Sequence, residues 1–431
     1  MTLLLLGLAA ALAGAPEPCT EYRRRVDVVR HIPGLVAFWD FVKREEGGRF
    51  AAWQAKGDRH EFHLDAVNYV RDYWDAGRPV AYDDFPLLGR GPFGQAVLFR
   101  REDDPTFRPC LLVPRARLHG SGLDVKGSGR SVSMVAWVIR ESGNHAIGGI
   151  WHEGTDLRET ASAAVRVERG RRQYALFAGL AGNSGASAAH VSENGASSFG
   201  DRYARNLAVT PEIMVAVPSG SPADVLDRSW SVAGFSFDNR QNTVTAYLDG
   251  KATEYWIDNP QTHPFFRWAC KAWVQAQLHR VPGMQPDEDP AFPPDQFYEP
   301  PEGKPLGVTV LEETGDRRVE LHRFPFTKVR VTLRKNGKGR FVPVSRELAA
   351  IKANPFWFGH DLYAPGSTGD GGPFTIGRVI HSGRSVGFTG YIGGMAVFSR
   401  ALSAKEMARL AAIGAPISLN GSCEYSRTRI F

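Results

Sequence analysis

Cysteine is scarce in this chain, and its placement argues against metal and redox chemistry. The 431 residues include 4 cysteines, Cys19, Cys110, Cys270 and Cys423, and no two of them form a C-x-x-C pair. A zinc site or a thiol-disulfide active site is therefore not indicated. In an exported protein, four cysteines would form two disulfides, for which three pairings are possible.

Several catalytic motifs are also missing. After His152-Glu153, Asp156 stands where a zinc protease of the H-E-x-x-H type needs its second histidine. The glycine-rich segment from Gly120 to Ser131 lacks the spacing of a phosphate-binding loop, and no G-x-S-x-G elbow lies between a buried strand and a helix. A zinc protease, a P-loop nucleotidase and an α/β-hydrolase are thus unsupported.

Neither sign of charge dominates the sequence. The formal net charge is +6 at pH 7, the pI is about 9.1, and basic and acidic residues are interspersed. No zinc-finger, homeodomain or RNA-recognition pattern occurs, so we expect no nucleic acid partner. The mild positive excess favours an acidic partner only through long-range attraction.

The apolar run at the N-terminus, Leu3 to Ala13, is too short to span a bilayer. Its Ala11-Leu12-Ala13 sequence is typical of a signal-peptidase site, although the basic residues that usually precede such a run are missing. We interpret residues 1–18 as a signal peptide, cleaved after Ala13 or Ala15. The mature protein is then expected to be secreted, periplasmic or on the cell surface, without a membrane span.

Segments with the apolar period of a helix are few, whereas turn-forming residues are abundant. The chain has 46 glycines and 28 prolines, and 43% of its residues are hydrophobic. Many short strands joined by turns follow from this composition, which favours an all-β sandwich or barrel. A chain of this length has room for one large domain or two smaller ones.

Four apolar segments with the character of strands open the chain, in the order Gly34–Phe41, Gly91–Phe99, Cys110–Pro114 and Ser131–Arg140. Further strand candidates follow between residues 146 and 208. Each segment is short and is bounded by glycine, proline or polar residues, as expected for strands of a sandwich.

The clearest hairpin spans residues 229–255. Two apolar strands flank a turn at Asn239–Asn242, and Asp249-Gly250 supplies the type I′ turn that follows. Such a pair of strands with a well-defined turn fixes the register of the sheet locally.

The stretch Phe374–Leu410 carries the second strong signal. It contains a strand of small and apolar residues, Gly390–Phe398, and then a short amphipathic helix. Ser403 lies three residues before Glu406, which is the spacing of a capping box.

In order and spacing, these elements resemble LamG-like domains of the concanavalin A class. Within the hairpin, the matching positions are Trp230, Tyr247, Asp249 and Gly250. The resemblance implies an all-β fold, an antiparallel two-sheet jelly-roll sandwich over residues 26–415. It also implies that the first and last segments lie side by side, which favours a Cys19–Cys423 disulfide and leaves Cys110 to pair with Cys270.

The main departure from that family is a long insertion, residues 256–373, before the closing strand. It contains a second hairpin, in which Phe326–Leu333 and Arg340–Val344 flank a turn at Asn336-Gly337. We therefore expect antiparallel β-structure beside the sandwich. The hairpin is rich in cations, namely Lys328, Arg330, Arg334, Lys335, Lys338 and Arg340. They form either a surface for a polyanion or a solvated edge whose charge prevents edge-to-edge pairing.

Carbohydrate recognition is the leading function that the resemblance implies, with a neutral or acidic polysaccharide or glycan as the partner. Aromatic and polar side chains at one rim or on the concave sheet would contact the sugar. The candidate carbohydrate-binding residues are Trp151, Asn194, His263, Trp268 and His360, and other tryptophans in or near expected loops are Trp256, Trp273 and Trp357. A non-catalytic adhesion or structural module is a further alternative.

A carbohydrate-active enzyme is the runner-up, with a lyase of acidic polysaccharide favoured over a hydrolase. Hydrolases of this class often carry their carboxylates as E-x-D-x-x-E on one strand, whereas Glu313, Asp316 and Glu320 here have helical or loop spacing. A lyase needs a base, an acid and a group that neutralises the substrate carboxylate. The candidates for these roles are His152, His190, Arg202 and Tyr203.

No cofactor is firmly indicated, and calcium is the one metal that the resemblance implies. The closing strand of that family commonly carries an acidic pair, where this chain has Gly393-Gly394. This difference puts an inherited calcium site in doubt. Asp40 and Asp370 remain candidate ligands.

Overall fold

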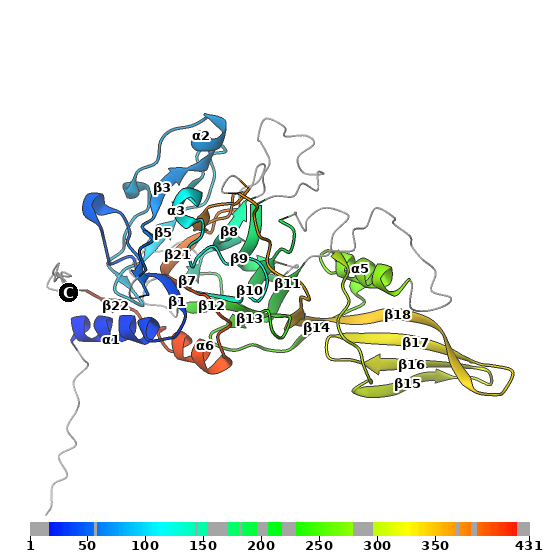
Figure 1. Cartoon of the computed structure of the whole chain (residues 1–431). Helices are drawn as coiled ribbons and strands as arrows, with labels where there is room; N and C mark the ends of the chain where they lie inside the picture. Colours follow the sequence, from blue (N-terminus) through cyan, green and yellow to red (C-terminus); the bar gives the residue numbers. More distant parts are fainter. Residues whose placement is uncertain are drawn as a thin grey trace, which may run out of the picture.

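The computed structural model describes residues 17–419 apart from 56–57, 143–144, 153–170, 181–182, 196–205, 218–229, 279–295, 368–369 and 381–385. Within this part of the chain, two large antiparallel sheets pack face to face, and a third sheet projects from one end of the sandwich (Figure 1). The predicted all-β, two-sheet antiparallel sandwich is confirmed. No helix in the described part of the chain is long and apolar enough to cross a membrane.

The first sheet has eight strands in the order β19-β13-β12-β7-β21-β1-β2, and β5 also pairs with β21. Its strands are β1 (Leu35–Trp39), β2 (Trp53–Gln54), β5 (Val97–Phe99), β7 (Val132–Arg140), β12 (Ser231–Asp238), β13 (Thr243–Leu248), β19 (Phe356–Trp357) and β21 (Gly390–Phe398). The β12–β13 hairpin confirms the prediction. Asp249 and Gly250 after it have φ of 50° and 76°, as a type I′ turn requires.

The second sheet has seven strands in the order β11-β10-β9-β8-β20-β6-β3. They are β3 (Asp65–Asn68), β6 (Pro109–Val113), β8 (His145–His152), β9 (Arg171–Leu180), β10 (Asn183–Val191), β11 (Leu207–Ile213) and β20 (Phe374–Ile376). Side chains from the facing sheets meet in one core. Trp39 of β1 stacks on Phe374 of β20 with ring centroids 5.3 Å apart, and Tyr174 of β9 lies 6.5 Å from Phe235 of β12.

Strand β21 lies in the interior of the first sheet, between β7 and β1, so the closing strand does complete the sandwich. Its two glycines are explained by packing. A Cβ on Gly393 would lie 2.9 Å from the Trp230 ring, and one on Gly394 would lie 2.9 Å from the Phe93 ring. Aromatic rings therefore fill the space that the acidic pair of the resembled family would need.

The closing helix α6 (Ala404–Ala411) begins with the predicted capping box. The Ser403 hydroxyl accepts a hydrogen bond from the Glu406 backbone N–H at 3.3 Å, and the Ser403 backbone N–H donates to the Glu406 carboxylate at 2.9 Å. Met407 and Leu410 are its buried residues.

The third sheet has five strands in the order β14-β18-β17-β16-β15. They are β14 (Tyr255–Asp258), β15 (Gly307–Glu313), β16 (Arg317–Arg323), β17 (Thr327–Lys335) and β18 (Phe341–Asn354). The predicted second hairpin is present as β17 and β18. Glu313 and Glu320, expected at helical or loop spacing, lie instead on β15 and β16. The division of the chain into sandwich and insertion stays a prediction.

Helix α5 (Arg267–Gln277) lies between β14 and β15 in the sequence and is not predicted by the β-rich interpretation of the insertion. Its buried residues, among them Ala269, Ala272, Trp273 and Ala276, recur at helical spacing. Arg346 of β18 reaches the helix, donating to Gln277 at 2.8 Å and lying 5.5 Å from the Trp273 ring. The helix thus packs on one face of the third sheet.

The remaining elements are short. They are α1 (Pro18–Arg30), α2 (Tyr69–Trp74), α3 (Arg115–Leu118), the 3-10 turns Glu46–Gly48, Tyr82–Asp84 and Pro260–Thr262, and the paired strands β4 (Arg90–Gly91) and β22 (Ile417–Ser418). Arg25 of α1 donates to the carbonyls of Pro92 and Ala415. The first and last described segments therefore lie side by side.

The predicted disulfide between Cys110 and Cys270 is wrong. Cys110 lies in β6 of the sandwich and Cys270 in α5 of the insertion, and both are buried thiols. Burial raises the pKa of the Cys270 thiol to about 12, so it stays protonated. Cys423 lies outside the described residues, and its pairing with Cys19 stays a prediction.

Candidate functional site

Trp151 and His190 meet on the outer face of the seven-stranded sheet. The Ser187 hydroxyl hydrogen-bonds to Gly234 of β12 at 3.2 Å, so Ser187 faces the other sheet, and alternation along β10 turns His190 the opposite way. The His190 and Trp151 rings lie 4.3 Å apart, and Phe177 lies 6.3 Å from each. Trp151 is only 1% exposed and lies within β8, in the region where strands are expected from the sequence.

Other polar groups surround this pair. His152 and Asn194 are buried, and the buried Arg172 donates to the Gly195 carbonyl at 3.1 Å. Of the predicted residues, the structure therefore brings Trp151 and His190 into contact, whereas His152 follows Trp151 in β8 and alternation turns it to the opposite face. Arg202 and Tyr203 lie outside the described residues.

His263 and His360 lie elsewhere, near the start of the third sheet. The His263 ring nitrogen Nδ1 accepts the backbone N–H groups of Phe265 at 3.1 Å and Phe266 at 3.3 Å, which orders the turn before α5. His360 packs edge-on against Trp357 at 6.4 Å between centroids. Trp268 is half-buried under the Arg267 guanidinium, 4.7 Å from its ring.

The two carboxylates named as calcium ligands have other partners. Asp40 is fully buried and accepts hydrogen bonds from the Tyr22 hydroxyl, the Trp53 indole and two backbone N–H groups, at 2.7–2.9 Å. Asp370 is exposed and accepts the Ser367 hydroxyl at 2.8 Å. Among the described residues, no three His, Cys, Asp or Glu side chains are grouped to hold a metal ion.

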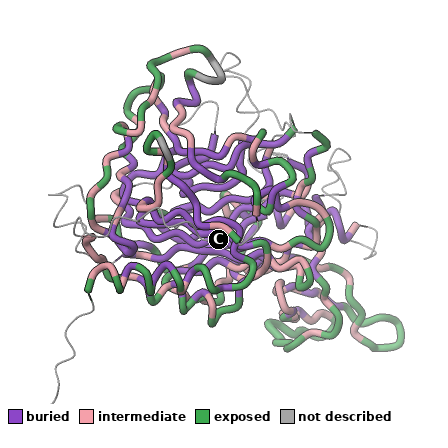
Figure 2. Tube along the Cα trace, turned by 60° about the vertical axis from the view of Figure 1, so that its left-hand side comes forward, coloured by how far each residue is buried: buried purple, intermediate pink, exposed green. Residues whose placement is uncertain are grey.

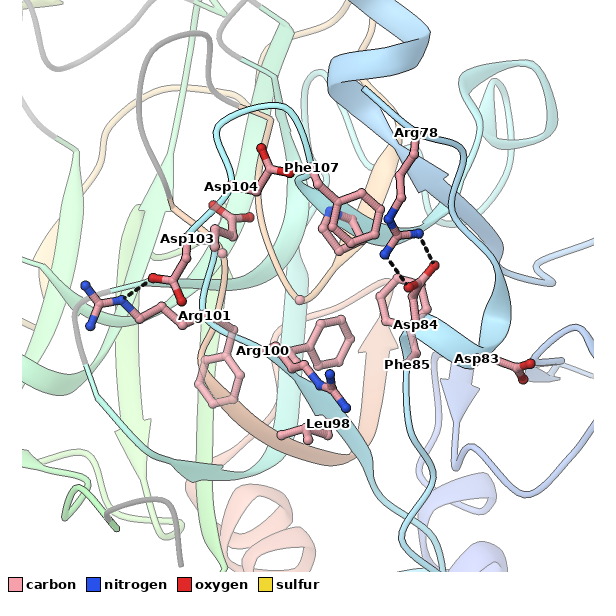
Figure 3. Close-up of a pocket in the computed structure, with 16 residues that line it drawn as sticks. Arg78, Asp83, Asp84, Phe85, Leu98, Arg100, Arg101, Asp103, Asp104 and Phe107 are labelled. Atoms are coloured by element: carbon pink, nitrogen blue, oxygen red, sulfur yellow. Dashed lines mark hydrogen bonds and ion pairs between the residues drawn. The ribbon is translucent and has the colours of Figure 1, made fainter. Parts of the chain in front are cut away.

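A pocket of about 320 Å³, which we call the loop pocket, is lined by β5, β6 and the segments 78–85 and 100–107 (Figure 3). Buried rings of Phe85, Phe99 and Phe388 form its apolar part. Charged side chains of both signs surround them, and Figure 3 shows Arg78 reaching from one side to Asp84. The pocket thus combines an aromatic floor with a charged rim.

The charged groups of the loop pocket largely satisfy one another. Arg78 pairs with Asp84 through two hydrogen bonds of 2.7 and 3.0 Å, and its guanidinium covers the Phe107 ring at 3.6 Å. The hydrogen bond from Arg78 holds the pKa of Asp84 below its usual value. At the inner end, Glu102 pairs with the buried Arg378. A ligand in the loop pocket would therefore have to compete with these existing ion pairs.

A second hollow, of about 520 Å³, lies where the third sheet joins the sandwich, and we call it the base groove. The polar side chains that line it are amides and carboxylates, namely Gln241, Asn242, Gln277, Glu299 and Glu302. Its rings are Trp357 and Phe326, and Pro300, Pro301 and Gly303 complete the lining. No lysine or arginine is part of this lining.

The Trp357 indole is held in place by its neighbours. Tyr298 packs edge-on against it at 5.6 Å, and Tyr298 itself is 2% exposed. A Cβ on Gly359 would lie 2.1 Å from the Trp357 ring, so only glycine lets the indole lie there. The half-buried ring therefore presents a fixed surface at the groove.

Sequence reasoning found only part of this groove. Trp357 was among the tryptophans considered, but Gln277 and Glu302 were not, because α5 and the path of residues 299–303 were not predicted. The signal that could have found Gln277 is the helical spacing of the apolar residues in α5.

Comparisons with known proteins give a distant likeness alone. No protein-family model and no curated protein matches the sequence. Among solved structures, domain 4 of an extracellular arabinanase from Geobacillus stearothermophilus, in complex with arabinotriose, is 10% identical, with a TM-score of 0.37 over 88% of this chain and 98% of that one. Botulinum neurotoxin type C is 7% identical, with a TM-score of 0.32 over 90% of this chain and 52% of that one.

Trypanosoma rangeli sialidase is 11% identical, with a TM-score of 0.33 over 91% of this chain and 37% of that one. All three TM-scores lie below 0.5, so we draw nothing about function from these structures. The sandwich assignment rests instead on the strand order of the two sheets.

Proposed function

We propose that the protein binds carbohydrate and that a neutral glycan occupies the base groove. The observation that carries this proposal is the lining of the groove, where a fixed tryptophan lies among amide and carboxylate side chains. Sugar hydroxyls both donate and accept hydrogen bonds, which amides and carboxylates can match, and the apolar face of a sugar ring packs on an indole. A volume of about 520 Å³ falls within the range of small-molecule sites.

The charge of the lining selects among glycans. Glu299 and Glu302 are the ionisable groups of the lining. Arg346 pairs with Glu302 from outside the groove. An acidic sugar would lose the hydration of its carboxylate or sulfate without gaining a cation from this lining, which is a desolvation cost. A neutral glycan avoids that cost, and an acidic glycan, which the sequence left open, fits this groove less well.

Membership of the LamG-like family and a secreted, periplasmic or cell-surface location belong to the same proposal. The two-sheet sandwich supports the first at the level of fold alone. A carbohydrate-binding role suits a protein that meets glycans outside the cytoplasm. Both statements rest on the sequence patterns described above.

A glycan array tests the proposal. The wild-type protein should retain neutral oligosaccharides, and Trp357→Ala should lose that retention. Trp256→Ala is the matched control, because Trp256 is also half-buried but lies on β14 outside the groove lining. If no neutral or acidic glycan is retained, carbohydrate binding is excluded and an adhesion or structural module becomes the better hypothesis.

A second candidate function, a lyase of acidic polysaccharide, is favoured by one observation. The Trp151 and His190 rings lie 4.3 Å apart, so an imidazole and an indole are in contact on the outer face of one sheet. A lyase would release unsaturated ends that absorb in the ultraviolet, and His190→Ala would abolish that signal. If uronic-acid polymers give no product, the lyase hypothesis is excluded. The proposal that a glycan binds in the base groove would still stand.

A further inference from the structure

Strand β15 forms one edge of the third sheet, and its surface is open. All seven residues, Gly307–Glu313, are exposed, and among the described residues the strand pairs with β16 alone. Figures 1 and 2 show the third sheet projecting from the sandwich, with exposed chain along its outer part. The backbone groups on the free side of β15 thus have no neighbouring strand in the described part of the protein.

Large apolar side chains gather on this edge. Leu306, Val308, Val310 and Leu311 are 66%, 52%, 50% and 50% exposed, and they make up four of the eight exposed large hydrophobic residues in the described chain. Single exposed aliphatic residues are ordinary, but a contiguous set on a free edge strand marks a surface that pairs with another chain.

The opposite edge of the same sheet, strand β14, is shielded from the addition of another strand, unlike β15. Trp256 of β14 lies between the ammonium groups of Lys328 and Lys352, each 4.9 Å from its ring, and its indole donates to Glu254 at 2.7 Å. Asp258 is the one exposed residue of β14, and an exposed charge on an edge strand discourages strand addition. Residues 307–311 contain no charged side chain and no proline, so this part of β15 lacks those defences.

We propose that β15 pairs in antiparallel register with β15 of a second copy of this chain. The charges at its ends favour that orientation. Lys304 precedes the strand, whereas Glu312 and Glu313 end it, paired within the chain to Arg317 and Arg318. Asp316 follows them. Antiparallel pairing brings Lys304 of one copy towards the acidic end of the other, and parallel pairing would set acid beside acid.

The apolar residues also define a register. With the two-fold axis at Thr309, Val308 of each copy lies opposite Val310 of the other, which buries two valine pairs on one face of the joined sheet. The pairing of β15 with β16 has a register shift between Val310 and Glu312. The four residues before that shift, 307–310, can therefore pair regularly with the second copy. The interface is small, and we expect a dissociation constant on the order of micromolar.

Sedimentation velocity over a range of concentrations tests this proposal with the full chain. The wild type should pass from monomer to dimer, and Val310→Lys should sediment as a monomer throughout. Val310 is half exposed and packs in no core cluster, so the variant is expected to fold. Val215→Lys is the matched control, because Val215 is 76% exposed and lies after β11, away from β15. It should dimerise like the wild type.

Two results would overturn the proposal. One is a wild-type protein that stays monomeric up to about 100 µM. The other is a dimer that Val310→Lys leaves unchanged, which would place the interface elsewhere. Lys304→Glu gives a finer check, since it should weaken the dimer several-fold at low salt and less at high salt. None of these results depends on glycan binding.

Discussion

The indole of Trp151 and the imidazole of His190 lie 4.3 Å apart although a whole strand, β9, runs between their own strands. Ala175 of β9 is the residue paired with His190, and its small side chain leaves room for the two rings to meet above it. Both rings are buried, at 1% and 0% exposure. The contact between these two rings therefore contributes to packing on the outer face of the seven-stranded sheet.

His190→Ala should lower the free energy of unfolding by roughly 2–4 kcal/mol, as for other large-to-small changes in a packed interior. Ala175→Leu should also destabilise the protein, because the added atoms would enter the space where the rings meet. Chemical denaturation measures both effects. A His190→Ala protein as stable as the wild type would show that the ring contact contributes nothing to the fold.

Asp40→Ala should destabilise the protein by about 3 kcal/mol or more, since it leaves the Tyr22 hydroxyl, the Trp53 indole and two backbone N–H groups without their acceptor. Asp40→Asn should cost less, because one acceptor oxygen remains. Thermal unfolding with and without calcium separates this structural role from metal binding. A calcium-dependent rise in the wild-type melting temperature that Asp40→Ala abolishes would favour the calcium hypothesis instead.

Gly394→Ala should destabilise the protein by roughly 1–3 kcal/mol, because the new Cβ would lie 2.9 Å from the Phe93 ring and 3.2 Å from Trp137, in the buried cluster on the outer face of the first sheet. Gly337→Ala is the matched control. Nothing lies within 4 Å of a Cβ at Gly337, in the exposed turn of the third sheet. Equal stability of the two variants would refute the packing explanation for the glycines of β21.

Acid should weaken the cap of α6. The hydrogen bond from Arg400 lowers the pKa of Glu406 to about 2, aided by the backbone and side chain of Ser403 and opposed by partial burial. Since the folded-state pKa lies below the usual value of about 4.5, this contribution is present at neutral pH and is lost as the pH falls towards 2. The group is largely exposed, so the effect should be small.

Comparison of the wild type with Glu406→Gln between pH 6 and pH 2 isolates that contribution. The stability difference between them should shrink over the acidic part of that range. A difference that stays constant down to pH 2 would contradict the assigned ion pair.

The sandwich was predictable because its signals are local. Asp249-Gly250 must adopt positive φ in the turn after the β12–β13 hairpin, and Ser403 with Glu406 can cap only a helix start. The apolar run Gly390–Phe398 likewise favours a strand buried on both faces, and β21 is one.

The site was harder to predict because it depends on contacts between distant segments. Trp151 was a candidate for contact with sugar, yet its ring is buried against His190 and Phe177. The base groove brings together Gln241, Gln277 and Trp357, which lie in three separate parts of the chain. No local sequence pattern predicts this contact. The Cys110–Cys270 disulfide failed for the same reason, since the pairing depended on where the insertion packs.

Isothermal titration calorimetry with a neutral oligosaccharide selected from the glycan array tests the central claim, carbohydrate binding in the base groove, most directly. We expect Trp357→Ala to weaken binding by about tenfold or more, and Gln241→Ala, an exposed change in the same lining, to weaken it several-fold. Trp256→Ala should bind like the wild type. Equal affinities of the wild type, Trp357→Ala and Gln241→Ala would contradict the account.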